Sequence, residues 1–221
     1  MTLLDYPGHV ACLVFLSGCN FSCPFCYNSS LICKSSDNFI SEADFFAFLD
    51  KRKGLLDGVA ITGGEPLMNK EIIPFIKKIK EKGFKVKVDT NGSFPDVLQS
   101  LIEENLVDYV AMDIKNTFEK YQLTTNCNVD LDKIKKSINI LLTSFIDYEF
   151  RTTVVKQFHT LDDLKQISEN IKGAKNYYLQ SYLDKDSVLQ KGLSPLSKDE
   201  LQLCLKVVKQ NIKNASLRGV D

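Results

Sequence analysis

The chain has 221 residues, of which 44% are hydrophobic and 25% are charged, an ordinary balance for a globular protein with one core. Its 28 basic residues equal its 28 acidic ones, so charge supports neither a nucleic-acid nor a membrane partner, and we expect neither. No apolar run is long enough to span a bilayer, and no secretory signal is evident, so we expect a cytoplasmic protein. Three of the seven cysteines crowd into eight residues, which favours metal binding over disulfides.

Short apolar runs alternate with amphipathic stretches along the chain. The predicted strands are Val10–Leu16, Gly58–Thr62, Lys85–Asp89, Asp108–Asp113, Tyr148–Val155 and Asn176–Gln180. The predicted helices are about 41–53, with Ser41 as the N-cap, about 72–82, about 95–104, 130–143, one that begins near Leu161, and about 198–212. Strands that are each followed by a helix predict parallel β/α units with right-handed crossovers. Because a full eight-unit barrel takes ~250 residues, we predict an α/β fold, a partial open (β/α)6 barrel, with a flat doubly wound sheet as the alternative.

The strongest motif is formed by Cys19, Cys23 and Cys26, a Cys-x3-Cys-x2-Cys spacing directly after the first predicted strand. Three thiolates on one loop can bind three irons of a cubane cluster and leave the fourth iron open, as catalysis requires. A structural zinc site is the alternative, because thiolates bind either metal and Cys33 or His9 could be a fourth ligand.

Polar or glycine-rich residues also end the other predicted strands. Gly63-Gly64-Glu65-Pro66 follows the second strand, where glycines permit close approach of a ligand and Glu65 could accept from an ammonium group. Asp89-Thr90-Asn91-Gly92 ends the third strand, and Asp113-Ile114-Lys115 ends the fourth, with both charges on one side. Arg151 lies in the fifth strand and needs either a salt-bridge partner or an anion, and Gln180 closes the sixth. A turn or a solvated charge pair would explain each motif alone, but strand ends form the active-site face of a β/α barrel.

Together these motifs resemble the radical SAM superfamily, whose signature includes the three cysteines, an aromatic residue such as Phe25 before the last one, and a Gly-Gly-Glu-Pro motif. The resemblance implies a single radical SAM domain over residues 1–221. It implies that Cys19, Cys23 and Cys26 hold a [4Fe-4S] cluster, and that S-adenosylmethionine (SAM) binds the open iron. The implied chemistry is reductive cleavage of SAM to methionine and a 5′-deoxyadenosyl radical.

A narrower likeness covers nearly the whole chain. The segments 4–8, 54–59, 89–92, 107–115 and 178–180 resemble the activating proteins of anaerobic ribonucleoside-triphosphate reductase, within the glycyl-radical enzyme activases. By that likeness, Lys115 acts with the three cysteines in catalysis, and Asp89, Thr90 and Asp113 bind a monovalent cation. The residues expected to bind the cofactor are Phe25, Tyr27, Gly63, Gly64, Glu65, Asp89, Thr90, Asn91, Asp113, Lys115, Arg151 and Gln180.

The likeness also implies partners. These are anaerobic ribonucleotide reductase or another glycyl-radical enzyme as the substrate, and a flavodoxin or ferredoxin as the electron donor. A radical SAM enzyme acting on a small molecule, such as a deazapurine synthase, is the first alternative, and a zinc-binding interaction module is the second. A barrel left open at its side favours a protein substrate. We expect Cys12, Cys127 and Cys204 to be packing residues, and His159 is given no role.

Overall fold

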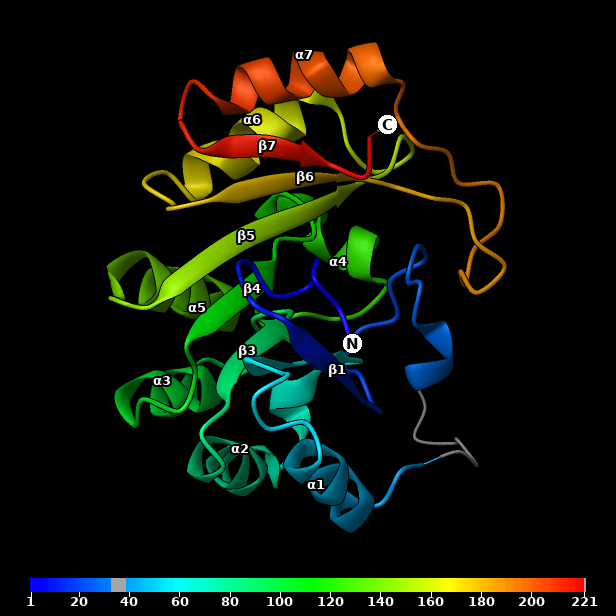
Figure 1. Ribbon diagram of the computed structural model, residues 1–221. Coiled ribbons are helices and arrows are strands. Elements are labelled where there is room, and N and C mark those ends of the chain that lie inside the picture. Colours follow the sequence, from blue (N-terminus) through cyan, green and yellow to red (C-terminus); the bar gives the residue numbers. More distant parts are fainter. Residues whose placement is uncertain (33–38, 221) are drawn as a thin grey trace.

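The structure is a computed structural model that describes residues 1–32 and 39–220. Its centre is one sheet of seven parallel strands, which lie side by side in chain order (Figure 1). The strands are β1 (Ala11–Leu16), β2 (Gly58–Gly63), β3 (Lys85–Thr90), β4 (Tyr109–Asp113), β5 (Asp147–Val154), β6 (Tyr177–Ser181) and β7 (Ala215–Arg218). Since β1 and β7 are the two edges of the sheet, the barrel is open, which confirms the predicted fold class.

Helices connect the strands and lie along the outer side of the curved sheet (Figure 1). They are α1 (Glu42–Asp50), α2 (Ile72–Glu81), α3 (Pro95–Glu103), α4 (Tyr121–Thr125), α5 (Leu131–Thr143), α6 (Leu161–Asn170) and α7 (Lys198–Val208). All six predicted strands are present, but the sheet also contains β7, which was not predicted from the sequence. Its four residues are too few to show a periodic pattern, and pairing with β6 defines the strand.

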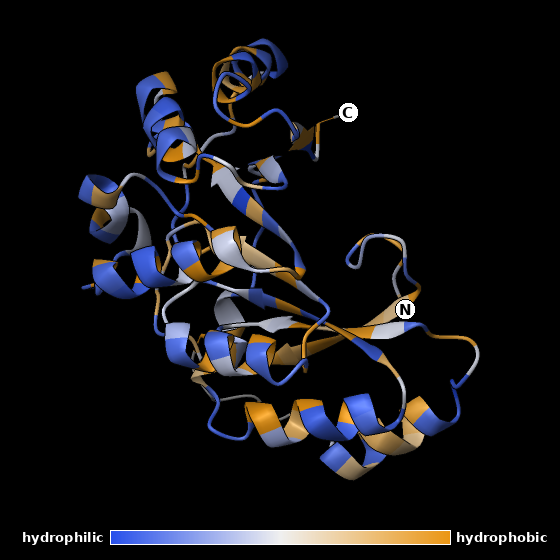
Figure 2. Cartoon of the chain, turned by 90° about the vertical axis from the view of Figure 1, so that its left-hand side faces the viewer, coloured by the Kyte–Doolittle hydropathy of each residue, from blue (hydrophilic) through white to orange (hydrophobic). Residues whose placement is uncertain are grey.

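Local sequence explains where the helices begin and which side they bury. The Ser41 hydroxyl accepts from the Asp44 backbone N–H before α1, as expected, and Ser197 and Glu200 form a capping box before α7. Helix α2 buries Ile72, Ile76 and Ile79 against the sheet. Figure 2 shows hydrophilic and hydrophobic residues alternating along the helices, as in amphipathic helices that cover a core. No helix in the described ranges is both long and apolar enough to cross a membrane.

The N-terminal segment closes the barrel at the end where the strands begin. Thr2 exchanges two backbone hydrogen bonds with Ala11 at the start of β1. The buried ring of Tyr6 packs against Tyr109, the first residue of β4, with ring centroids 6.2 Å apart. A methyl group at Gly58 would lie only 2.9 Å from this ring, so the glycine leaves room for it. The opposite end, where the strands finish, is therefore the end that can admit ligands.

Candidate active site

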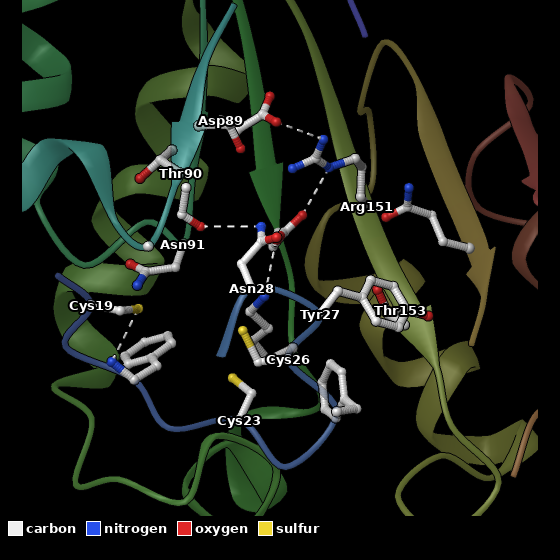
Figure 3. Close-up of a pocket in the computed structure, with 18 of the residues that line it drawn as sticks. Cys19, Cys23, Cys26, Tyr27, Asn28, Asp89, Thr90, Asn91, Arg151 and Thr153 are labelled. Carbon is white, nitrogen blue, oxygen red and sulfur yellow. Dashed lines mark hydrogen bonds and ion pairs between the residues drawn. The ribbon is translucent and has the colours of Figure 1, made fainter. Parts of the chain in front are cut away.

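A cavity of about 430 Å³ lies at the carboxyl ends of the strands, a volume typical of small-molecule sites. Figure 3 shows side chains from the cysteine loop, β3 and β5 around this cavity. Of the residues expected from the sequence, those that line the cavity are Cys19, Cys23, Phe25, Cys26, Tyr27, Gly63, Gly64, Asp89, Thr90, Asn91, Asp113, Lys115, Arg151 and Gln180. Glu65 is the exception among the expected residues.

The cysteine loop, residues 17–28, is held in place by backbone hydrogen bonds to distant segments. The Gly18 N–H donates to the Leu31 carbonyl at 2.7 Å, and the Ser22 N–H donates to the Thr125 carbonyl of α4 at 3.1 Å. Within the loop, the Cys26 N–H donates to the Cys23 carbonyl, and the Phe21 N–H points to Cys19 Sγ at 3.4 Å. The three sulfur atoms are thus carried on one braced loop that forms a wall of the cavity.

The donor chemistry of this wall fits an iron–sulfur cluster. Three cysteines around one cavity can each bind a different iron of a cubane. Within residues 1–32 and 39–220, no three His, Cys, Asp or Glu side chains are grouped as a single metal ion would need. Burial raises the pKa of Cys23 to about 12, partly offset by the Lys115 ammonium, so Cys23 is a thiol until a metal displaces its proton.

The alternative zinc ligands do not join the three cysteines. His9 lies where the strands begin, with its Nε2 atom 3.2 Å from Lys85 Nζ, and β1 separates it from the cysteine loop. Cys33 lies outside the described residues. Cys12 and Cys204 are buried in the core, and Cys127 packs against it, in agreement with the expected packing role.

Two carboxylates and three cationic side chains form a continuous chain across the inner face of β3, β4 and β5. Asp89 Oδ1 lies 2.5 Å from Lys87 Nζ, and Asp89 Oδ2 lies 3.3 Å from an Arg151 terminal nitrogen. Asp113 Oδ1 lies 2.8 Å from Arg151 Nε, and Asp113 Oδ2 lies 3.0 Å from Lys115 Nζ. Arg151 therefore has the salt-bridge partners that the sequence required, and it faces the cavity as well (Figure 3).

The two carboxylates in this series of ion pairs, Asp89 and Asp113, stay ionised. Burial alone would raise the pKa of Asp113, but the charges of Arg151 and Lys115 outweigh burial and hold the pKa at about 2. For Asp89, the opposing charges of Arg151 and Lys87 likewise outweigh burial and lower the pKa. The monovalent cation implied for Asp89, Thr90 and Asp113 fits these residues poorly, because cationic groups of the chain already engage both carboxylates.

Glu65 hydrogen-bonds to other residues of the protein and does not line the cavity. The side chain is 2% exposed, and its oxygens accept hydrogen bonds from the Leu67 N–H, the Thr90 hydroxyl and the Asn91 N–H at 2.6–3.0 Å. The resemblance implied a contact with the SAM ammonium group, whereas in the structure this carboxylate joins the end of β2 to the end of β3. Burial raises the pKa of Glu65 to about 7, against the effect of its three donors.

The two glycines before Glu65 bring β2 against the cysteine loop. A methyl group on Gly63 would lie 2.2 Å from the Leu16 carbonyl oxygen, and one on Gly64 would lie 2.1 Å from the Gly18 carbonyl oxygen. Gly63 also has a φ angle of +121°, which residues other than glycine rarely adopt. The close approach that the sequence suggested is therefore made by the protein's own backbone, although both glycines also line the cavity.

Several residues at or beside the site were not predicted from the sequence. His159 is buried, its Nδ1 accepts from the Val155 N–H at 3.1 Å, and its Nε2 lies 2.8 Å from the Lys115 carbonyl oxygen, to which it donates. Arg218 of the missed strand β7 lines the cavity, lies 3.7 Å above the Tyr178 ring and pairs with buried Glu149. An isolated histidine and a short C-terminal strand offer no sequence signal for these contacts.

The segment that follows β6 packs over the cysteine loop. The Tyr27 hydroxyl accepts from the Leu183 N–H at 2.6 Å, and the Tyr27 ring stacks on Tyr182 at 6.1 Å. The Gln190 N–H donates to the Pro24 carbonyl at 2.9 Å. Tyr27 therefore does structural work beside the cavity that it lines.

Comparison with known proteins agrees with this site. The family model described as the radical SAM superfamily matches residues 13–171. The chain belongs to the radical SAM superfamily. Enzymes of this superfamily use a [4Fe-4S] cluster and SAM, and the three cysteines and the cavity suit both.

Individual proteins and solved structures are also similar to this chain. A candidate glycyl-radical enzyme activating enzyme of Methanocaldococcus jannaschii is 33% identical over 100% of this radical SAM chain and 94% of its own length. A 7-carboxy-7-deazaguanine synthase of Koribacter versatilis is 29% identical over 72% of this chain and 67% of its own length. The crystal structure of Streptococcus suis SuiB bound to SAM matches 95% of this chain with a TM-score of 0.76 at 13% identity, which supports the fold. This chain spans about half of SuiB, 50% of its length.

Proposed function

We propose that this radical SAM enzyme, acting as one domain, is an activase that generates a glycyl radical on another protein, with anaerobic ribonucleoside-triphosphate reductase as the target. The observation that carries the proposal is the likeness over 94% of the length of a candidate glycyl-radical enzyme activating enzyme. The opening and the strand-end motifs of the sequence support the reductase as the target. A glycine is a suitable target because both flanking amides stabilise a radical at its Cα.

Each part of the chain has a role in this activity. Cys19, Cys23 and Cys26 would hold the cluster. When the cluster and SAM are bound, reductive cleavage of SAM would supply a 5′-deoxyadenosyl radical. The loop from 63 to 65 braces the cysteine loop, while Lys115 and Arg151 set the charge of the cavity. Tyr6 and Tyr109 are buried together at the end of the barrel where the strands begin, opposite the carboxyl ends of the strands.

The open side of the barrel supports a protein substrate. Residues from both edges of the sheet line the cavity, including Phe15 of β1 and Arg218 of β7, so it reaches the gap between them. Large apolar side chains are exposed nearby. Phe15 is 51% exposed and Leu183 is 51% exposed, and both line the cavity, while Leu4 is 89% exposed next to the lining residue Asp5. An apolar rim suits the docking of a polypeptide loop.

The proposed reaction also requires an electron donor and a reducing compartment. We propose a flavodoxin or ferredoxin as the donor, acting in the cytoplasm, where thiols stay reduced.

The test mixes the reduced, cluster-loaded protein, SAM and the anaerobic reductase without oxygen, and records an EPR spectrum. We expect a glycyl-radical doublet, which disappears when the target glycine of the reductase is replaced by alanine. The variant Cys26→Ala serves as the control and should give no signal.

A deazapurine synthase is the second candidate, because the Koribacter versatilis enzyme shares 29% identity over 72% of this chain. If no radical forms on the reductase while SAM turns over when a pterin precursor is added, the activase proposal is wrong and this candidate replaces it.

A further inference from the structure

Asp89 and Asp113 together present four carboxylate oxygens to the interior of the barrel, and each oxygen has its own cationic donor. Lys87 and Arg151 engage the two oxygens of Asp89, and Arg151 and Lys115 engage the two of Asp113. Three positive groups thus face two negative ones, so the cluster carries a net charge of 3 − 2 = +1. A metal cation placed here would find its oxygen ligands engaged and would meet a net positive charge.

Lys87 is the unusual member of this group. It lies in the middle of β3, its side chain is 3% exposed, and it pairs in register with Ala60 on β2 and Tyr109 on β4. A lysine buried this deeply is costly unless its charge is compensated, and Asp89, two residues further along the same face, compensates it.

We propose that the Lys87 ammonium serves as a built-in replacement for a monovalent metal cation, so that this protein binds SAM without requiring Na⁺ or K⁺. Lys87 does not line the cavity, so it is a positioning residue that acts through Asp89. Together with Arg151, Lys87 keeps the Asp89 carboxylate ionised, balances its negative charge and orients it beside the SAM cavity. The proposal rests on SAM binding, as the superfamily requires, and is independent of which partner receives the radical.

The test measures the dissociation constant of SAM for the cluster-loaded protein by anaerobic calorimetry, without any partner enzyme. Titrations are done in K⁺, in Na⁺ and in tetramethylammonium chloride at equal ionic strength, because tetramethylammonium is too large to enter the site. For the natural protein we expect values that agree within about twofold, below the ~5-fold onset of ordinary coupling between two ligands.

Three variants locate the effect. Lys87→Met keeps the length of the side chain and removes its charge, so K⁺ should now tighten SAM binding about 5-fold or more. Lys87→Arg keeps the charge and should remain insensitive to the cation. Lys85→Met removes the exposed lysine two residues earlier on the same strand, and it should also remain insensitive.

Two results would overturn the proposal. A natural protein whose SAM affinity rises several-fold in K⁺ or Na⁺ has a metal-cation site, whatever Lys87 contributes. If both the natural protein and Lys87→Met are insensitive, the charge of Lys87 is not what replaces the cation. Should Lys87→Met fail to fold, Lys87→Gln supplies the same comparison, and the result for the natural protein decides the first point by itself.

Discussion

Individual buried polar residues at this site act mainly by joining segments of the chain. Glu65 receives three hydrogen bonds from two strand ends, and His159 donates to the backbone of Lys115. Neither contact requires a ligand, so each can be tested by stability as well as by SAM binding. Their residue types were visible in the sequence, whereas their partners were not.

We predict that Glu65→Gln lowers the free energy of unfolding by about 1–3 kcal/mol, the cost of leaving a buried polar group without a suitable partner. One glutamine oxygen can still accept from Leu67 and Thr90, but the glutamine NH₂ group would face the Asn91 N–H, so two donors oppose each other. Chemical denaturation measures the change. Glu81→Gln on the exposed side of α2 is the control and should change stability little. Equal stability of Glu65→Gln and the natural protein would show that this network contributes nothing.

His159 gives a prediction about pH. Burial lowers the pKa of this imidazole below 6.5, since its backbone hydrogen bonds offset burial only in part. The folded state therefore binds the proton less readily than the unfolded state, and the stability due to neutral His159 is present above about pH 6.5 and lost as pH falls below it. His159→Gln removes this loss. As the pH falls, the difference in unfolding free energy between the natural protein and His159→Gln should therefore narrow by up to ~1.4 kcal/mol per pH unit.

Denaturation at a series of pH values between 7.5 and 5 checks this expectation, in about half-unit steps. The chain contains only two histidines, so His9→Gln is the matched control. A gap that stays constant over this range, or that narrows equally for His9→Gln, contradicts the role assigned to His159.

At the scale of elements, the contact between the end of β2 and the cysteine loop determines the shape of the site. We predict that Gly64→Ala greatly reduces cluster loading, because the added methyl group would lie 2.1 Å from the Gly18 carbonyl oxygen and 3.2 Å from the Cys19 nitrogen. The cysteine loop must then move. The natural protein should carry about four irons per chain after anaerobic reconstitution.

Iron and sulfide analysis measures the loss, and circular dichroism shows whether the rest of the fold is intact. Gly83→Asn, at the end of α2, is the control, because a side chain there meets nothing within 4 Å and asparagine tolerates its φ angle of +87°. Full iron content in Gly64→Ala would show that the loop adapts freely and that the glycine is not needed for it.

At the scale of the whole molecule, the proposed function requires a partner to reach the cavity, and residues of both sheet edges, β1 and β7, line it. We predict that Leu4→Glu slows radical transfer to the proposed protein partner without changing SAM affinity, because it places a charge on an exposed apolar residue next to Asp5, which lines the cavity. Leu203→Glu, on the outer helix α7, is the matched control, since Leu203 is also exposed, at 52%, but lies on a different element.

Initial rates of glycyl-radical formation, followed by EPR at several concentrations of the partner, measure this effect. We expect Leu203→Glu to form the glycyl radical at rates close to those of the natural protein. Identical rates for Leu4→Glu and the natural protein would mean that the partner does not dock on this rim.

The sequence by itself determined what depends on neighbours in the chain. Strand and helix positions follow from periodicity and caps such as Ser41, and the cysteine spacing and the strand-end motifs located all but one of the expected residues around one cavity. These features are local. Alternation of apolar and polar side chains marks a strand, and a capping residue marks the start of a helix, whatever the distant parts of the chain contain. Parallel strands then bring their ends to one edge, so the position of the cavity followed from the order of elements.

Only the tertiary structure decided which distant groups meet. The strand β7 exists through its pairing with β6, two of the three donors to Glu65 lie at the end of β3, and His159 reaches Lys115 across 44 residues. The contacts of Arg151 with Asp89 and Asp113 depend on the register of β3, β4 and β5, whereas the contacts of Lys87 with Asp89 and of Lys115 with Asp113 join residues two apart in the sequence. A charge in a sequence shows only that it needs a partner, and the partner is selected by which side chains the sheet brings within a few ångströms.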